Sequence, residues 1–351
     1  MDIRSLLKEL NKTKGSDLLL VAGNPPCLRI GNVLERQGAK NLTPEEIETF
    51  IAPLVRKENL EEFKRVLELD VSYADDLARY RVNLHYQRGS MAAAIRLVQK
   101  QIPTLEQLGL PAIVKTFTAF ERGLVLITGP TGSGKSTTQA AMIDLINTTR
   151  SCHIITIEDP IEYMHEAQKA VIEQREVGID TLSFGEALKR VLRQIPDVIL
   201  VGEIRDLESI QMAITAAETG HLVITTLHTP DAVQAVDRII DVFPPHQQNQ
   251  VRTQLSLTLQ GVVAQQLIPK KDGKELALAC EVLIASPAIR NIIRKGSTQD
   301  IYSMVELGKQ QGMISMEASL KELVKKGDIT KEEALCYAIS RERLEKLLGM
   351  A

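Results

Sequence analysis

Tryptophan is absent from this chain of 351 residues, and aromatic residues make up only 3% of it. Proteins that bind single-stranded nucleic acid stack its bases on aromatic side chains, so such stacking platforms are scarce here. An excess of basic residues is also missing, because the formal net charge is −3. We therefore expect no broad nucleic-acid-binding surface, although local basic patches stay open.

Cysteines are few and far apart. They are Cys27, Cys152, Cys280 and Cys336, and no CxxC pair occurs. This spacing indicates neither a zinc ribbon nor a redox dithiol, and we expect reduced, buried thiols.

Long apolar runs are missing as well. The first residues are polar and amphipathic, which is not the pattern of a signal peptide. No stretch approaches the ~20 apolar residues that a membrane helix needs. We therefore expect any membrane role to come through partner proteins.

The remaining composition is that of a globular protein, with 44% hydrophobic and 25% charged residues. A chain of this length favours two domains and a tail. We expect a small α+β domain in residues 1–100 and a linker in residues 101–116. An α/β core is expected in residues 117–270 and a mostly helical region in residues 271–351.

Local signals predict the elements of the first domain. A short apolar strand is expected at Asp17–Val21, and Thr43 before Pro44 is typical of a helix start. The strands Tyr80–Gln87 and Met91–Leu97 are close enough in sequence to form a hairpin.

The α/β core is predicted from alternating strand and helix patterns. Continuous apolar runs predict strands at Gly123–Thr128, His153–Glu158, Asp197–Val201 and Leu222–Thr226. Helical patterns cover Lys135–Asn147, Phe184–Arg193 and Leu207–Thr219. This alternation favours a parallel sheet covered by helices on both faces. The chain after Pro244 is expected to be mostly helical, with a capping box at Thr330–Glu333.

A glycine-rich loop lies between the first of these strands and the first helix. It comprises Gly129, Pro130, Thr131, Gly132, Ser133, Gly134, Lys135 and Ser136, followed by Thr137. Glycines let successive backbone N–H groups point at phosphate oxygens, and the helix adds its positive dipole end. Lys135 would contact the β- and γ-phosphates and Ser136 a Mg²⁺ ion. The alternative, a chance glycine-rich turn, does not explain the flanking strand and helix. The loop predicts ATP and Mg²⁺ as ligands.

Carboxylates follow two other predicted strands. Glu203 comes after an apolar strand and Gly202, where an acid could orient the attacking water; its alternative role is a salt bridge to Arg205. Three further acids surround a proline after the strand His153–Glu158: Glu158, Asp159 and Glu162. They could hold Mg²⁺ through water or form an ion pair with a neighbouring arginine. They could also form a solvated acidic turn.

Two histidines and two arginines complete the candidate residues. His221 and His228 stand at the two ends of one strand, roughly 23 Å apart, which excludes a shared metal ion. We expect one of them near phosphate and the other at an interface. Arg81 and Arg96 lie on neighbouring strands of the first domain. They either belong to a solvated strand face or reach the triphosphate of an adjacent subunit as arginine fingers.

These motifs together resemble the secretion-ATPase superfamily, and within it the PilT-type retraction motors of type IV pili. The loop Gly129–Ser136 is similar to the Walker A motif, and Thr156–Glu162 to the Asp box. Leu200–Glu203 resembles the atypical Walker B motif, and Ala217–Leu222 together with Thr225–His228 resembles the His box. The segment Ala288–Arg290 is similar to one that marks retraction motors.

The resemblance implies a homohexamer whose chains have a PAS-like N-terminal domain, a RecA-like ATPase core and a helical C-terminal region. It implies that Glu203, Lys135, Glu162 and His228 are catalytic and that His221, His228, Arg81 and Arg96 serve as sensor or interface residues. Glu158 and Asp159 would be associated with Mg²⁺.

The implied work is ATP-driven pilus retraction at the cytoplasmic face of the inner membrane. Implied partners are an inner-membrane platform protein and a second pilus motor ATPase, with no nucleic acid. The accessory PilU-type subtype stays open, as does a pilus-assembly or type II secretion ATPase, although the tetracysteine motif usual in those relatives is missing. A nucleic-acid translocase, a non-hydrolysing regulatory module and a small-molecule kinase are the more distant alternatives.

Overall fold

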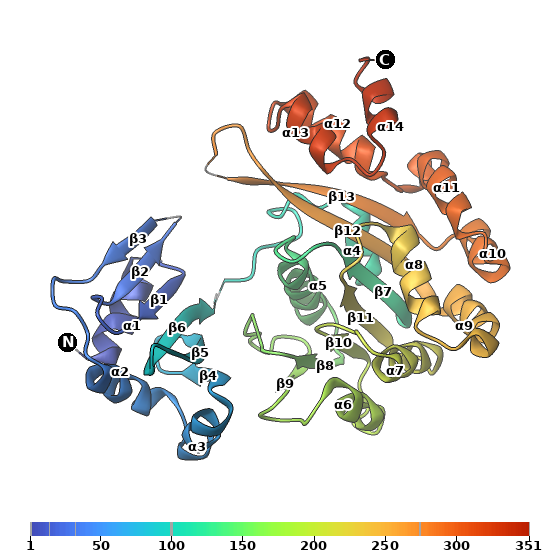
Figure 1. Ribbon diagram of the computed structural model, residues 1–351. Helices are drawn as coiled ribbons and strands as arrows, with labels where there is room; N and C mark the ends of the chain where they lie inside the picture. Colours follow the sequence, from blue (N-terminus) through green and yellow to red (C-terminus); the bar gives the residue numbers. More distant parts are fainter. Residues whose placement is uncertain (1, 14, 32, 99–100, 274, 351) are drawn as a thin grey trace. The chain divides into compact units, whose positions relative to one another are not determined.

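The computed structural model describes residues 2–13, 15–31, 33–98, 101–273 and 275–350 (Figure 1). The chain divides into two compact units. Unit 1 comprises residues 1–101 and 162–164, and unit 2 comprises residues 102–161 and 165–351.

Unit 1 is an antiparallel sheet with helices packed on one face. The strand order is β3-β2-β1-β6-β5-β4. The strands are β1 (Asp17–Leu20), β2 (Cys27–Ile30), β3 (Val33–Arg36), β4 (Glu68–Ala74), β5 (Arg79–Gln87) and β6 (Ser90–Val98). The helices are α1 (Ile3–Lys12), α2 (Pro44–Ile51) and α3 (Lys57–Val66), with a 3₁₀ turn at Ala52–Leu54. One core joins side chains of all three helices to alternate residues of the strands, such as Tyr80, Val82 and Leu84 in β5.

Local sequence explains these elements. Thr43 and Glu46 form a capping box at the start of α2, since each side chain binds the other residue's backbone N–H. The predicted hairpin is confirmed as β5 and β6, with Gln87 paired to Ser90. Its turn residues Arg88 and Gly89 have φ values of 49° and 77°, the left-handed backbone that a two-residue hairpin turn needs.

Unit 2 is built on a mostly parallel sheet with the order β13-β12-β7-β11-β10-β8-β9. Its strands are β7 (Gly123–Thr128), β8 (His153–Glu158), β9 (Val171–Glu176), β10 (Val198–Val201), β11 (Leu222–Leu227), β12 (Leu259–Pro269) and β13 (Leu276–Ile284). Only β13 runs antiparallel to its neighbour. The four strands predicted for the core are all present, within one residue of their predicted ends.

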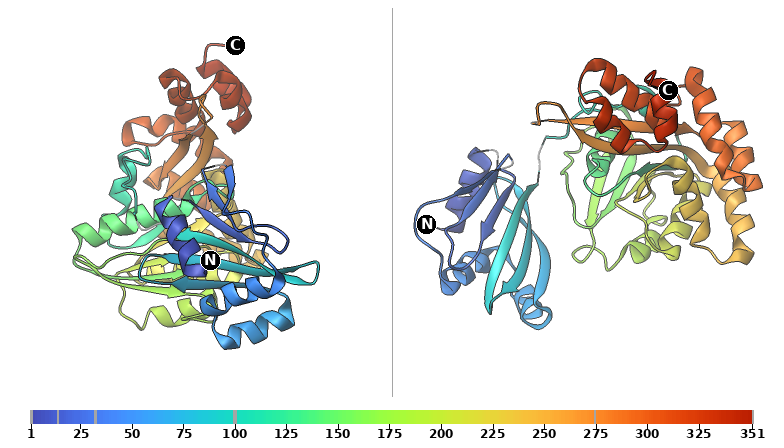
Figure 2. Two further views of the ribbon diagram at one scale, coloured as in Figure 1. Left: turned by 90° about the vertical axis from the view of Figure 1, so that its left-hand side faces the viewer. Right: turned by 45° about the horizontal axis from the view of Figure 1, so that its top comes forward.

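Helices cover both faces of this sheet (Figure 2). They are α4 (Ile113–Phe117), α5 (Lys135–Thr149), α6 (Phe184–Val191), α7 (Leu207–Glu218), α8 (Ala232–Asp241), α9 (Pro245–Thr258), α10 (Pro287–Lys295), α11 (Ile301–Leu307), α12 (Met316–Lys326), α13 (Lys331–Tyr337) and α14 (Arg341–Leu347), with 3₁₀ turns at Thr298–Asp300 and Gly308–Gln311. Alternate residues of β7, β8, β10 and β11 enter different cores, one with α5 and one with α6 to α11. The predicted α/β fold with a parallel sheet between helical layers is confirmed.

The chain after Pro244 departs from the expectation. It is not helical throughout, because β12 and β13 extend the central sheet before helices resume at Pro287. The run Val262-Val263-Ala264 is buried on both sides, and a short apolar run of this kind has no period that separates a strand from a buried helix. The helices α12 to α14 then pack on this strand pair through Ile268, Ala277 and Ala279.

The four cysteines are free thiols. Cys280 is buried, Cys27 and Cys152 are half-buried, and Cys336 is exposed. Their reduced state stays a prediction, whereas the expected burial is wrong for Cys336, which lies near the end of the short helix α13.

Candidate active site

The candidate residues of unit 2 gather where the parallel strands end. The strands β7, β11, β10 and β8 run side by side in register, with Thr225 opposite both Leu126 and Val201, and Val201 opposite Ile157. The segments that follow these strands therefore leave the sheet at one edge, its carboxyl edge. Ligands bind at this edge in open α/β sheets.

The glycine-rich loop joins β7 to α5 at this edge. Gly129, Gly132 and Gly134 have φ values of 145°, 79° and 85°, which only glycine adopts readily. A Cβ atom on Gly129 would lie 2.3 Å from the carbonyl oxygen of Gln265 and 2.6 Å from Ser133 Oγ. The loop can curl against β12 only because that atom is missing.

Two buried side chains of the loop, those of Ser133 and Lys135, carry hydrogen-bond donors. Ser133 Oγ is buried and has no hydrogen-bond partner in the described residues. The ammonium group of Lys135 is also buried and donates to the carbonyl oxygens of Gly129 and Pro130, at 2.8 and 2.9 Å. Phosphate oxygens would accept from both side chains, so the loop fits a bound polyphosphate.

The first turns of α5 are fixed to strands on both sides. Ser136 and Thr137 are half-buried in the first turn. In the next residues, Gln265 Nε2 in β12 donates to Thr138 Oγ1 at 2.9 Å, and Gln139 Nε2 donates to the carbonyl of Val201 at 3.2 Å. These buried amides hold the helix relative to β12 and β10.

Glu203 lies two residues beyond β10 at the same edge. Its Oε2 atom lies 2.8 Å from Arg205 Nη2 and 3.2 Å from His228 Nε2. Thr226 Oγ1 in β11 donates to the carbonyl of Gly202 at 2.7 Å, which fixes the backbone just before this carboxylate. The structure thus brings Glu203 and His228 together, and the salt bridge to Arg205 is present as well.

The three acids after β8 differ in how far they are exposed to solvent. Glu158 is half-buried, and its Oε1 accepts from Thr156 Oγ1 at 2.6 Å and from Gln174 Nε2 at 3.3 Å. Asp159 and Glu162 are exposed. Their association with Mg²⁺ and the catalytic role of Glu162 stay predictions.

His221 lies at the opposite end of β11 from His228. Its Nδ1 atom is 3.0 Å from the carbonyl of Ala216 and 3.2 Å from Thr219 Oγ1, and its own carbonyl accepts from Gly123 N–H. His221 is therefore at the amino edge of the sheet, away from the loop in its own chain. A role for it at an interface stays a prediction.

Arg81 and Arg96 stand directly opposite each other on β5 and β6 of unit 1. Arg96 Nε is 2.7 Å from Asp17 Oδ1, and Arg81 Nε is 3.5 Å from Asp70 Oδ1. Both arginine side chains are partly exposed on the sheet face opposite the helices. This placement suits either a solvated face or a contribution to another subunit.

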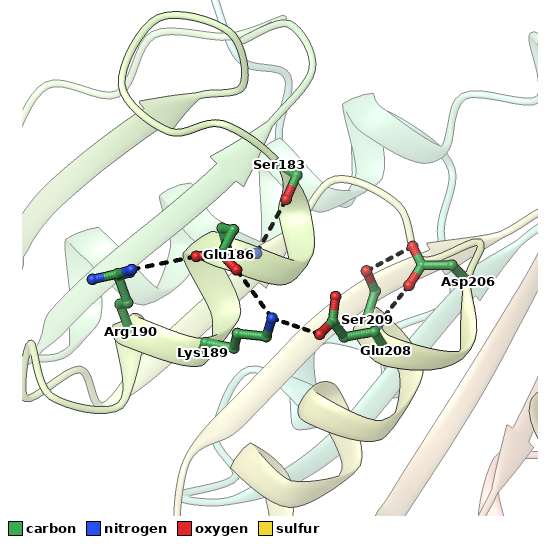
Figure 3. A network of polar contacts seen from close by, with 7 residues as sticks. All are labelled: Ser183, Glu186, Lys189, Arg190, Asp206, Glu208 and Ser209. Carbon is green, nitrogen blue, oxygen red and sulfur yellow. Dashed lines mark hydrogen bonds and ion pairs between the residues drawn. The ribbon is translucent and has the colours of Figure 1, made fainter.

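A polar network between α6 and α7 fixes the segment after Glu203 (Figure 3). Asp206 caps α7 by accepting from the N–H and the hydroxyl of Ser209, both at 2.9 Å. Lys189 in α6 lies between Glu208 and Glu186, at 2.6 and 3.0 Å, and hydrogen bonds to these carboxylates raise the pKa of Lys189.

Sequence reasoning missed several residues of the site. Gln139, Gln265 and the pair Thr128–Thr229 hold the carboxyl edge together, with Thr128 Oγ1 and Thr229 Oγ1 2.6 Å apart. The one available signal was a polar Gln265 within the apolar run of β12, because a buried amide must find partners.

Two kinds of feature are absent from the described part of the chain. None of its helices has the length and the apolar character needed to cross a bilayer. The described residues also hold no cluster of three or more histidine, cysteine or acidic side chains suited to a metal ion.

Comparisons with known proteins find similarity to secretion-system and type IV pilus proteins. Residues 78–338 match the family described as "Type II/IV secretion system protein". The type IV pilus retraction ATPase PilT of Pseudomonas aeruginosa is 46% identical, over 95% of this chain and 97% of its own length. The type IV pilus ATPase PilU of the same organism is 40% identical, over 100% of this chain and 92% of its own.

A solved structure is similar over almost the whole chain. It is a crystal structure of the pilus retraction motor PilT with bound ADP, at 44% identity and a TM-score of 0.93, and the match covers 99% of each chain.

Proposed function

We propose, from the premise that the chain belongs to the type II/IV secretion system protein family, that it is an ATP-hydrolysing motor that powers type IV pilus retraction. The observation that carries this proposal is the meeting of the phosphate-binding loop and the Glu203 carboxylate at the carboxyl edge of one sheet. The names of the similar proteins, PilT above all, support retraction as the work performed.

The chain's own residues have distinct roles in this proposal. Lys135 and the backbone N–H groups of the loop bind the phosphates, and Lys135 exchanges its carbonyl acceptors for phosphate oxygens. Ser136 would hold Mg²⁺, which supplies charge neutralisation at the phosphates when bound. Glu203 orients the attacking water, and His228 contacts the same carboxylate.

The wider assembly belongs to the proposal as well. We propose a homohexamer at the cytoplasmic face of the inner membrane, in contact with a platform protein and working beside a second pilus motor. Support for the second motor comes from the similarity of the chain to both PilT and PilU. We propose that Arg81 and Arg96 serve the nucleotide of a neighbouring chain.

A single substitution tests the hydrolytic role. Glu203→Gln keeps the shape of the side chain but removes the negative charge that orients water, so we expect turnover to fall at least about a hundredfold. Binding of a fluorescent ATP analogue should stay within about twofold of the parent chain. Phosphate release measures the first quantity and fluorescence titration the second.

Two outcomes would contradict the assignment. Near-normal turnover of the Glu203→Gln chain would show that another group orients the water. A parent chain that binds ATP without releasing phosphate would favour a regulatory module instead.

A further inference from the structure

The contacts of the Glu203 carboxylate are unevenly distributed between its two oxygens. Both neighbouring donors, Arg205 Nη2 at 2.8 Å and His228 Nε2 at 3.2 Å, contact Oε2. Oε1 has no hydrogen bond to any described residue. A carboxylate held through one oxygen presents the other as an acceptor in a fixed direction.

The backbone around Arg205 is fixed on both sides of the residue. Ile204 is buried in the core, and its N–H donates to the carbonyl of Thr226 at 3.3 Å. Asp206 on the other side is the N-cap of α7 (Figure 3). An exposed arginine usually gains little from an ion pair, because two mobile side chains must be ordered. Here the arginine starts from an ordered backbone, and Glu203 is only 25% exposed.

His228 cannot hold the carboxylate in the same way. It offers a single donor, and only in the form that carries a proton on Nε2. Arginine is charged at every physiological pH and its guanidinium is planar, so it restricts how the carboxylate turns. Without Arg205, the carboxylate could rotate about its last side-chain bond, and both oxygens would sample the same positions.

We propose that Arg205 is a positioning residue for hydrolysis, which anchors Oε2 of Glu203 so that Oε1 is directed at the attacking water. This role rests on the proposed ATPase function and refines it. The sequence offered the salt bridge to Arg205 as an alternative to a catalytic role of Glu203. In this proposal the same salt bridge is part of the catalytic arrangement. Misplacement of a catalytic group by about 1 Å can cost on the order of a hundredfold in rate.

The test compares the parent chain and Glu203→Gln with four further variants of the full chain. Arg205→Gln removes the charge and the planar donor pair, Arg205→Lys keeps the charge, and the double variant Arg205→Gln with Glu203→Gln asks whether the arginine acts through the glutamate. Arg341→Gln is the matched control, because Arg341 in α14 is a similarly exposed arginine that pairs with a carboxylate, Glu345, outside the network of Figure 3. Phosphate release gives kcat and KM, fluorescence titration gives the affinity for an ATP analogue, and thermal melting checks folding.

We expect Arg205→Gln to lower kcat about tenfold or more, with KM and nucleotide affinity within about twofold of the parent. Arg205→Lys should recover part of the rate, and Arg341→Gln should match the parent. On the Glu203→Gln background, Arg205→Gln should lower turnover no further, as expected for residues that act as a unit.

Other results would overturn the role of Arg205. They are an unchanged or raised kcat, a loss confined to KM or affinity, or a further loss on the Glu203→Gln background. These results leave the proposed ATPase intact as long as the parent chain hydrolyses ATP and Glu203→Gln does not. A parent chain that releases no phosphate would overturn both proposals.

Discussion

Glu281 in β13 is a carboxyl group that water barely reaches, with 3% of its surface exposed. Burial raises the pKa of Glu281 to about 7, and the nearby charges of Asp231 and Glu317 act in the same direction. Its Oε1 accepts from the N–H of Ala232 at 2.9 Å, which opposes that rise in pKa. The carboxyl group of Glu281 therefore links β13 to the start of α8, and it titrates near neutral pH.

The raised pKa predicts how stability depends on pH. Because the folded chain holds this proton up to a higher pH than the unfolded chain, Glu281 favours folding below its unfolded pKa, near 4.5. That contribution is lost as the pH rises through about 7. The loss amounts to on the order of 3 kcal/mol over the whole window.

Glu281→Gln mimics the neutral form, so we expect its stability to change less than that of the parent between pH 5 and pH 8. Denaturant unfolding at several pH values measures the difference. Glu281 lines a cavity whose other charged or titratable side chains are Tyr302, Glu317 and Arg343. These three side chains are the same in the variant and the parent, so they do not account for a difference between the two. Glu322→Gln, at an exposed position of α12, is the control. Parallel curves for Glu281→Gln and the parent would contradict the prediction.

The stability of a short helix depends on the residues at its ends, and α2 is a simple example. It has only eight residues, and Thr43 together with Glu46 satisfies backbone N–H groups at its start. A helix this short gains little from its own hydrogen bonds, so capping and the packing of Ile47, Phe50 and Ile51 hold it.

Removal of this cap should loosen α2 without affecting unit 2. We expect Thr43→Ala to cost about 1 kcal/mol, because the N–H of Glu46 loses its acceptor. Hydrogen exchange of residues 45–51 should then be faster by about fivefold. Thr49→Ala in the same helix is the matched control, because Thr49 only bonds the carbonyl of Glu45 in the preceding turn. Equal exchange in the two variants would show that the cap does not hold the helix.

At the scale of the whole molecule, the two arginines of unit 1 offer a test of the proposed ring. If Arg96 acts on the nucleotide of a neighbour, then Arg96→Gln and Glu203→Gln impair different halves of the same site. Each variant alone should be nearly inactive. Random mixing of the two chains should restore about a quarter of the sites, because some sites then combine an intact glutamate with an intact arginine.

Phosphate release from the mixture, after exchange of subunits, measures this recovery. A mixture of Arg81→Gln with Glu203→Gln tests in the same way whether Arg81 acts on the nucleotide of a neighbour. Activity equal to the average of the separate variants would show that the arginines act within their own chain or not at all.

The direction of work is tested in cells. A retraction motor is needed after pili have formed, so we expect deletion of the gene to leave cells with pili that do not retract. Electron microscopy of pili and a twitching assay measure the two properties. Loss of the pili themselves would favour a pilus-assembly motor.

The sequence by itself determined the parts that depend on neighbouring residues. The glycines at 129, 132 and 134 are required by a left-handed backbone, and the apolar runs of β7, β8 and β11 appear where they were predicted. The capping box at Thr330 and Glu333 is confirmed for the same reason. Backbone preferences and hydrogen bonds to adjacent residues act over a few positions, so a single segment contains the information.

Only the tertiary structure decided what meets at the carboxyl edge. The strand order places β11 between β7 and β10, so His228 reaches a carboxylate 25 residues earlier in the chain. The same order brings Gln265 to Thr138, 127 positions away, and makes a strand of a run that resembles a buried helix. Such contacts depend on which strands pair, and pairing is set by the burial of whole faces rather than by any one segment.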